Sequence, residues 1–354
     1  MKRKFSVLTV VMSLVIIAGV DYQQEASAQS VNVIPTFRVD PDWPQVPEQW
    51  RLGDVSSVAI DAAGNAWLLH RPRTLPPEEA HMAAPAVIGF DSEGQFLNAW
   101  GGDGEGYEWP QREHGLHIDY QDHAWLGGNN CPARNLPGLE PLFDDQLLKF
   151  TLDGEFVMQI GRANMSRGNA DGENLHEPAD AFVHPPTNEI FVADGYGNRR
   201  VAVFAAQTGD YKRHWGAYGN QPTDDPYTYD PDAAPSQQFG RPVHCATLSN
   251  DGLVYVCDRV NDRIQVFEPH GKFLIKWGVR GSGDGEFSQP QGLAIDGDGN
   301  VYVSEYGNDR IQVFDPQGRF LRKWGSEGSG DGEFIPPQGL AIDGAGNVYV
   351  SDKG

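Results

Sequence analysis

Apolar and polar residues alternate along this chain in short runs, and tight turns rich in Asp, Gly and Asn separate the runs. The clearest unit spans residues 289–325. Its alternation is that of half-buried strands, and its turns carry the residue types that chain reversals require. The pattern therefore predicts four antiparallel strands, here termed a to d, at residues 292–295, 301–304, 310–314 and 320–324.

The same unit recurs at a fixed interval. Gln289–Asp296 returns as Pro336–Asp343, and Asp262–Phe267 returns as Asp309–Phe314, each 47 residues further on. A period of about 40 to 50 residues with several short strands is typical of a propeller blade. We therefore predict an all-β, six-bladed propeller at residues 29–354, with blades at about 52–101, 110–161, 177–216, 241–278, 289–325 and 336–354.

The sixth blade is incomplete, because the chain stops where its strands c and d are still expected. Residues 36–40, ahead of blade 1, could supply one outer strand, but one strand does not replace two. An open blade would expose unpaired strand edges. Of the two explanations, a fragment of a longer protein or an irregular closure, we favour the fragment.

The N-terminus has the order of a secretory leader. Positive residues at 2–4 precede an apolar run at 7–20, and Ala26-Ser27-Ala28 follows. We predict a signal peptide at residues 1–28 and a secreted or periplasmic protein. No later segment has the roughly 20 apolar residues of a membrane span, so we expect no stable membrane insertion after cleavage.

The chain is strongly acidic. It has 27 Lys and Arg against 49 Asp and Glu, a formal charge of −22. Such a surface repels nucleic acid phosphates, so we predict no nucleic acid partner.

The chain has three cysteines, and an odd number leaves at least one of them unpaired within the chain. Cys245 and Cys257 fall on adjacent strands of one blade and could pair. Cys131 lies elsewhere in the sequence. Between a disulfide and buried free thiols, we predict free thiols.

Long insertions are confined to one rim of the predicted propeller. In a four-stranded blade the b–c and d–a connections open on the same face of the disc, and all the long segments belong to this class. They are residues 71–85, 127–145, 162–176 and 217–239. Long loops gathered on one face are typical of a binding or catalytic surface. We expect a small-molecule or peptide substrate, or a protein partner, at this long-loop rim.

Two histidines break the repeat on that rim. His114 stands where the repeat has Gln at the start of strand a, as in Gln291 and Gln338. His244 falls near the start of strand a in blade 4, and we place it one position further along the strand. Imidazoles from different blades that meet at a channel mouth could hold a metal ion. We therefore predict His114 and His244 as metal ligands.

Three further residues follow the ends of b strands and are expected at the same rim: Arg71, Tyr196 and Arg259. They lie in blades 1, 3 and 4.

The motif from Gln291 to Phe314, with Gly-Leu-Ala-Ile-Asp, Asn-Val-Tyr-Val-Ser and Asn-Asp-Arg-Ile-Gln-Val-Phe, resembles NHL repeats. Beyond this, the chain resembles the peptidyl-α-hydroxyglycine α-amidating lyases. The matching stretches begin at Asp42-Trp43-Pro44 and continue through 52–61 with His70-Arg71, then 114–116, 193–200 and 257–259.

This resemblance implies a zinc enzyme that splits a carbinolamide into an amide and glyoxylate. It implies that His114 and His244 bind zinc, that Arg71 and Tyr196 are catalytic, and that Arg259 lies close to them. Four departures stand out. In one, His244 follows Pro242-Val243 and not a proline directly. Gln338 occupies the position of the family's third zinc histidine, Gly339 occupies that of an adjacent Asp, and Gly197 replaces one of a pair of cysteines.

Two other functions remain open. A non-catalytic binding propeller would use the long-loop rim for a peptide, a glycan or a protein partner, and the missing third histidine favours it. A calcium-dependent, lactonase-like propeller would make calcium the alternative ion, but no convergent Asp, Asn and Glu set stands at the strand starts.

Overall fold

Strands make up nearly all of the regular structure. The computed structural model describes residues 37–135, 139–230 and 233–352, and within them 22 strands form six antiparallel sheets. Five sheets have four strands in chain order, and the sixth has two. The short 3-10 turns are η1 (Pro72–Thr74), η2 (Ala80–Met82), η3 (Ala217–Gly219) and η4 (Arg259–Asn261).

The first three blades follow the order of the chain. Blade 1 contains β1 (Asp54–Ile60), β2 (Ala66–Arg71), β3 (Val87–Phe90) and β4 (Phe96–Trp100). Blade 2 contains β5 (Glu113–Ile118), β6 (His123–Gly128), β7 (Leu147–Thr151) and β8 (Phe156–Ile160). Blade 3 contains β9 (Asp180–His184), β10 (Glu189–Asp194), β11 (Arg200–Ala205) and β12 (Tyr211–Trp215).

The remaining blades continue in the same way. Blade 4 contains β13 (Val243–Leu248), β14 (Val254–Asp258), β15 (Arg263–Phe267) and β16 (Phe273–Trp277). Blade 5 contains β17 (Pro290–Ile295), β18 (Val301–Glu305), β19 (Arg310–Phe314) and β20 (Phe320–Trp324). The two-stranded sheet contains β21 (Pro337–Ile342) and β22 (Val348–Asp352).

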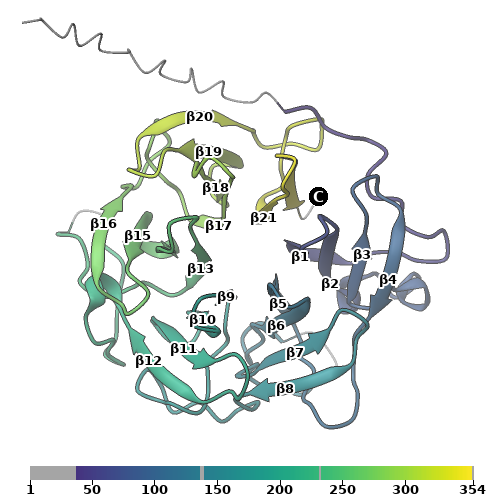
Figure 1. The fold of residues 1–354 in the computed structure, drawn as a ribbon, viewed down its shortest axis with the longest axis horizontal. Helices are drawn as coiled ribbons and strands as arrows, with labels where there is room; N and C mark the ends of the chain where they lie inside the picture. Colours follow the sequence, from purple (N-terminus) through teal and green to yellow (C-terminus); the bar gives the residue numbers. More distant parts are fainter. Residues whose placement is uncertain (1–36, 136–138, 231–232, 353–354) are drawn as a thin grey trace, which may run out of the picture. The chain divides into compact units, whose positions relative to one another are not determined.

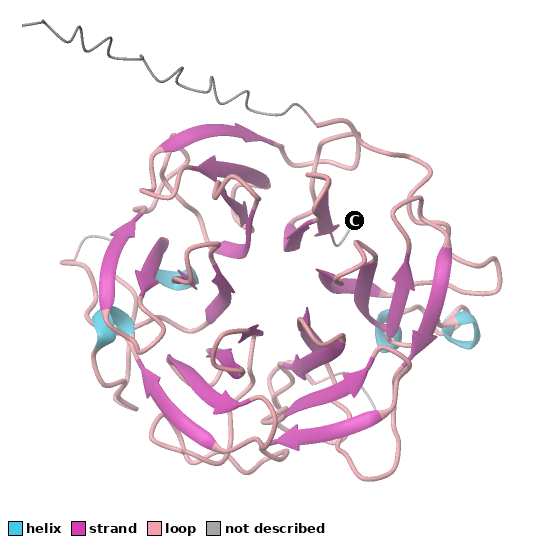
Figure 2. Cartoon of the chain, in the orientation of Figure 1, coloured by secondary structure: helices cyan, strands magenta, loops and turns pink. Residues whose placement is uncertain are grey.

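The sheets are arranged around a common centre, with the first strand of each sheet innermost (Figures 1 and 2). Neighbouring inner strands contact one another in chain order, and β21 contacts both β17 and β1. The ring of inner strands is therefore closed even though the last sheet has only two strands. The structure confirms an all-β propeller with five complete blades, and the prediction of a sixth, incomplete blade stays a prediction.

The segment ahead of blade 1 does not form the outer strand that the sequence suggested. Residues 37–40 have no strand structure. Phe37 packs instead on Tyr302 and Trp324 of blade 5, with ring centroids 6.3 and 4.9 Å apart. Burial of this aromatic ring against blade 5 stabilises the segment without strand pairing. The predicted leader at residues 1–28 lies outside the described residues.

Aromatic residues fill the spaces between adjacent blades. The Trp that ends strand d packs on a Phe of the next blade in the pairs Trp100 and Phe150, Trp215 and Phe267, and Trp277 and Phe314. These rings bury large apolar areas at contacts that only the tertiary fold creates. The hydrophobic core is thus divided among the blade interfaces, which leaves the centre of the ring open for polar groups.

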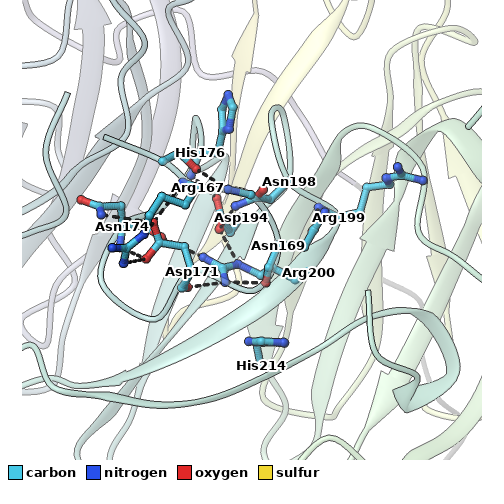
Figure 3. A network of polar contacts seen from close by, with 12 residues as sticks. Arg167, Asn169, Asp171, Asn174, His176, Asp194, Asn198, Arg199, Arg200 and His214 are labelled. Carbon is cyan, nitrogen blue, oxygen red and sulfur yellow. Dashed lines mark hydrogen bonds and ion pairs between the residues drawn. The ribbon is translucent and has the colours of Figure 1, made fainter. Parts of the chain in front are cut away.

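A buried ion pair recurs in three successive blades. Arg200 pairs with Asp194 at 2.7 Å, and the pairs Arg263 with Asp258 and Arg310 with Glu305 each measure 2.6 Å. Each Arg also donates to backbone carbonyls of the preceding d–a loop; in blade 3 these belong to Asn169, Asp171 and Asn174 (Figure 3). The pair therefore fastens the long loop of the rim to the end of strand b.

Cys245 and Cys257 form a disulfide, so the prediction of free thiols was wrong for this pair. They are directly opposed on β13 and β14, with Cα atoms 5.0 Å apart, a distance that a disulfide can bridge. Cys131 is free and buried. Within the described part of the chain, no helix has both the length and the apolar character that a membrane span requires.

Candidate functional site

Six equivalent residues, one from each sheet, surround the same end of the central channel, a cavity of about 260 Å³. The ladders between strands a and b align them, in chain order, as Ser56, His114, Ala179, His244, Gln291 and Gln338. His114, His244 and Gln338 belong to alternate sheets of the ring. The channel mouth therefore presents imidazole, imidazole and carboxamide at every second position.

The sequence placed His244 one residue further along its strand than the other rim residues, and this prediction was wrong. Leu248 is the last residue of β13 that pairs with β14, and Ile295 is the last residue of β17 that pairs with β18. His244 lies four residues before Leu248, and Gln291 lies four residues before Ile295. The position of His244 along β13 is therefore set by the a–b turn that follows the strand. The proline before the strand does not set it. His244 therefore lies at the same height in the channel as the residues it was compared with.

Three side chains from three blades meet at this point. The Nε2 atoms of His114 and His244 are 3.2 Å apart, and the Tyr196 hydroxyl lies 3.0 Å from each of them. Both histidines are 4% exposed. The group is a compact triangle of two nitrogens and one oxygen at the channel mouth.

The protonation of this triangle follows from its surroundings. The Nδ1 atom of His244 lies 2.7 Å from the backbone carbonyl of Gln291, which can only accept, so Nδ1 carries the proton and Nε2 a lone pair. Burial lowers the pKa of His244 well below its usual value, and the charge of Arg259 lowers it further. Burial and then the neighbouring His244 lower the pKa of His114 in the same way. Both rings are therefore neutral at neutral pH.

The loop that carries Tyr196 is fastened on both sides. The Asp194 carboxylate accepts from the His176 backbone at 2.7 Å and from the Asn198 side chain at 2.8 Å (Figure 3). On the other side, Gly195 approaches β13 so closely that a Cβ there would lie 1.9 Å from the carbonyl oxygen of Val243. Only glycine permits this approach, which brings Tyr196 beside the strand that carries His244.

A cation covers the ring of Tyr196. The guanidinium carbon of Arg134, from the long b–c loop of blade 2, lies 4.9 Å from the ring centroid, within the range of a cation–π contact. Arg134 also forms an ion pair with Glu177, which is only 3% exposed. Burial raises the pKa of Glu177 to about 7, against the opposing effect of Arg134. The long-loop rim thus contributes directly to the site, as expected.

Arg71 ends β2 beside this triangle. Its Nε donates to the backbone carbonyl of Glu113 at 2.9 Å, while its buried Nη1 has no hydrogen-bond acceptor among the described residues. The carboxylate of Asp54 lies 4.0 Å away. Burial lowers the pKa of Arg71 to about 10, and the charge of Arg112 contributes to the shift. Arg71 therefore remains a cation at neutral pH.

Arg259 follows β14 directly, at the start of η4. Its Nη2 donates to the Gln289 side chain at 2.8 Å, and its guanidinium carbon lies 4.9 Å from the centroid of Tyr306. Its positive charge acts on both His114 and His244. The structure thus brings all five residues singled out in the sequence to one rim.

The sequence did not single out Arg112, Arg134 or Glu177. Arg112 could have been noticed, because Arg-Glu-His-Gly at 112–115 stands where the repeat has Gln-Pro-Gln-Gly. Arg134 and Glu177 lie in long connections that follow no repeat, so no pattern indicated their place.

The side chains present fit a metal held by two imidazoles. Two nitrogens at the usual Zn–N distance of about 2.0–2.1 Å in a tetrahedral site are about 3.3 Å apart, close to the separation of His114 and His244. Gln338 stands at the equivalent place in the sixth sheet, and its Nε2 is buried without a partner among the described residues. An amide oxygen is a weaker zinc ligand than imidazole. Consistent with this substitution, no cluster of three His, Cys, Asp or Glu suited to a metal occurs in the described ranges.

Comparison with known proteins agrees with this architecture. The NHL repeat model matches residues 287–314. The chain contains an NHL repeat. It is 34% identical over 252 residues to the peptidylglycine alpha-amidating monooxygenase of Rattus norvegicus, covering 66% of this chain and 22% of that protein.

Two further relatives extend the comparison. The chain is 26% identical over 270 residues to peptidyl-alpha-hydroxyglycine alpha-amidating lyase 1 of Drosophila melanogaster, covering 70% of this chain and 44% of that protein. It is 25% identical over 247 residues to human NHL repeat-containing protein 3, covering 68% and 59%. The chain spans less than two thirds of the length of each relative. The predicted resemblance to NHL repeats and to the amidating lyases is confirmed.

Proposed function

We propose that the long-loop rim of this propeller cleaves N-acyl-α-hydroxyglycines between the amide nitrogen and the hydroxyl-bearing carbon. The products are a primary amide and glyoxylate. One observation carries the proposal: the Tyr196 hydroxyl and the Nε2 atoms of His114 and His244 come from three blades and lie within 3.2 Å of one another. The similarity to two amidating proteins supports the same reaction class.

The side chains suit the proton transfers of this reaction. Tyr196, as its phenolate, takes the proton of the substrate hydroxyl, and the electrons released form the aldehyde C=O bond as the C–N bond breaks. Tyr196 then gives this proton to the departing nitrogen, so that the phenolate is restored and no net proton is consumed. The guanidiniums of Arg71 and Arg134 balance the negative charge at Tyr196. Arg259 binds the substrate carboxylate.

His114 and His244 are the residues that would hold zinc, which acts on such substrates as a Lewis acid. Their neutral rings leave a nitrogen lone pair for the metal, and the carbonyl of Gln291 orients the ring of His244. Calcium is the alternative ion. It prefers oxygen ligands, so the pair of nitrogens favours zinc.

The test uses purified protein with α-hydroxyhippurate, with and without added zinc, and measures glyoxylate and benzamide together. We expect both products in equal amounts, with loss of about 100-fold or more in rate for Tyr196→Phe. Tyr120→Phe is the matched control, because Tyr120 is 47% exposed in an a–b turn. No glyoxylate above the level of the His114→Ala variant would refute the activity on this substrate.

The Cys245–Cys257 disulfide supports a further part of the proposal, namely that the protein is exported to an oxidising compartment. Thiol titration of protein recovered from the cell exterior and from the cytosol tests this. We expect one free thiol per chain in the exported form, and three free thiols there would contradict it.

A binding propeller without catalysis is the second candidate, and Gln338 at the third ligand position favours it. In that case the rim would hold a peptide, a glycan or a protein, and metal analysis would find no stoichiometric zinc. Tightly bound zinc at one ion per chain would count against this candidate.

A further inference from the structure

Two sets of arginines, apart from Arg71 and Arg134, differ in the oxygen that accepts from them. Arg200, Arg263 and Arg310 pair with buried carboxylates at 2.6–2.7 Å, which cancel their charge. Arg112 and Arg259 donate instead to the amide oxygens of Asn129 and Gln289, at 2.7 and 2.8 Å, and neither forms an ion pair with any described residue. An amide oxygen orients a guanidinium without neutralising it. No ion pair with a described carboxylate therefore neutralises these two arginines at the rim.

Arg112 is held rigidly beside the reacting triangle. It lies two residues before His114, and besides its side-chain bond its backbone carbonyl accepts from the Asn129 backbone at 3.0 Å. After burial, the charge of Arg112 is the strongest influence that lowers the pKa of Arg71. The charge of Arg112 also contributes to the lowered pKa of His114. The charge of Arg112 thus lowers the pKa of Arg71 in blade 1 and the pKa of His114 in blade 2.

Buried donors at this rim lack acceptors. Asn129 is only 1% exposed, and its Nδ2 donates to no described residue, although its oxygen accepts from Arg112. The Nη1 atom of Arg71 and the Nε2 atom of Gln338 are likewise buried without a hydrogen-bond acceptor among the described residues, although Arg71 Nη1 lies 4.0 Å from the Asp54 carboxylate. Buried donors of this kind are rare in folded proteins and call for an acceptor from a ligand. A ligand rich in negatively charged oxygens meets that need.

We propose that Arg112 and Asn129 form a second anion subsite of the rim, so that the preferred ligand carries two carboxylates. This inference rests on the proposed function, in which Arg259 takes the carboxylate of the glycine unit. Arg112 then takes a carboxylate on the N-acyl group. The ligand class is an N-acyl-α-hydroxyglycine with an acidic acyl chain, such as a dicarboxylic acid monoamide.

Two inert analogues that differ in one carboxylate test the subsite. N-succinylglycine and N-butyrylglycine have acyl chains of the same length, and neither has the hydroxyl group that cleavage requires. Calorimetry with the zinc-supplemented and the metal-free protein gives both affinities. A charge-assisted hydrogen bond in a partly buried site corresponds to a preference of about 10-fold or more for N-succinylglycine.

Variants assign the preference to Arg112. We expect Arg112→Gln to weaken N-succinylglycine about 10-fold and N-butyrylglycine less than threefold, and Arg112→Lys to restore part of the preference. Arg319→Gln is the control, because Arg319 is 77% exposed in a c–d turn, which opens on the opposite rim. It should change neither affinity.

Equal affinities for the two analogues, no measurable binding of either, or an unchanged preference in Arg112→Gln would each overturn the subsite. The test of the subsite and the test of the proposed activity can fail independently. A preference for N-succinylglycine without glyoxylate release from α-hydroxyhippurate would retain the subsite and reject that reaction. Glyoxylate release without the preference would retain the proposed reaction and reject the subsite.

Discussion

His114 and His244 are 130 residues apart in the chain, and their Nε2 atoms lie 3.2 Å apart at the channel mouth. Each ring is buried and uncharged, and the charges of Arg71 and Arg259 lower the pKa of both. The lone pair on Nε2 of His244 lies this close to Nε2 of His114, which favours either a proton shared between the rings or a shared cation. The predictions below follow from this arrangement and from the parts of the fold that hold it.

Replacing Gln338 by His should strengthen zinc binding. Gln338 has the place in the sixth sheet that His114 has in the second, so a third imidazole would complete a set from alternate sheets. We expect zinc affinity, measured by calorimetry, to rise at least 10-fold, because imidazole is a better zinc ligand than an amide oxygen.

Gln291→His provides the control for this experiment, since it introduces the same ring at the same strand position in the adjacent sheet. Its effect on zinc affinity should be smaller than that of Gln338→His. Equal gains from both variants would show that position around the ring does not matter, contrary to the proposed ligand set.

Arg134→Met should impair turnover more than substrate binding. The variant removes the cation that lies over the Tyr196 ring and leaves Glu177 without its ion pair. We expect kcat for glyoxylate release to fall about 10-fold with KM changed less than threefold, and Arg134→Lys to recover part of the loss. A rise in KM with kcat intact would place Arg134 in ground-state binding instead.

Arg200→Met should destabilise the fold and the Tyr196 loop together. Arg200 and Asp194 are completely buried, so the variant leaves an uncompensated carboxylate inside blade 3. Breaking such a pair costs about 3–5 kcal/mol of unfolding free energy. Denaturant unfolding gives the value.

Arg213→Met is the comparison variant, because its pair with Glu189 is partly exposed in the same blade. Its loss should be at most about 1 kcal/mol. Similar losses for the two variants would mean that burial does not determine the role of the Arg200 pair.

Removing the disulfide should destabilise the propeller without abolishing it. Cys245 and Cys257 are 12 residues apart, and a loop of that size corresponds to about 3 kcal/mol of unfolding free energy. The double Ala variant should therefore unfold at lower denaturant than the oxidised wild type. Under reducing conditions most of the difference should disappear, and its persistence would contradict an effect of the bond itself.

His117 should make folding sensitive to acid. Burial lowers its pKa to about 4, and its Nε2 accepts from the Val183 backbone at 3.1 Å, so the folded state binds fewer protons than the unfolded state between pH 4 and 6.5. Its contribution to unfolding free energy therefore falls as pH drops through that range, by up to about 3 kcal/mol.

The measurement compares wild type with His117→Leu at pH 7 and pH 4.5. Asp180, whose pKa burial raises to about 7, has the opposite pH dependence, but it contributes equally to both proteins. The difference between the proteins isolates His117. A difference that does not change with pH would show that the pKa of His117 is the same in the folded and the unfolded state.

Much of the architecture could be predicted from local pattern. Alternation and turn residues within units such as 289–325 identify strands that pair with their chain neighbours, and nearest-neighbour pairing needs no long-range information. The positions of Arg71, His114, Tyr196 and Arg259 followed from the same repeat, because a residue that replaces a template residue inherits its place in the blade.

The failures have two causes. The packing of Phe37 and the cover that Arg134 forms over Tyr196 depend on contacts between distant segments that no repeat encodes. The register of His244 and the disulfide at Cys245 depend on the exact pairing of β13 with β14, which the sequence pattern did not fix. By itself, the sequence determined which residues form strands and which blades carry unusual polar residues, since these are properties of short segments. Only the tertiary structure decided which atoms meet, because closing the ring of inner strands sets the separation of side chains from different blades.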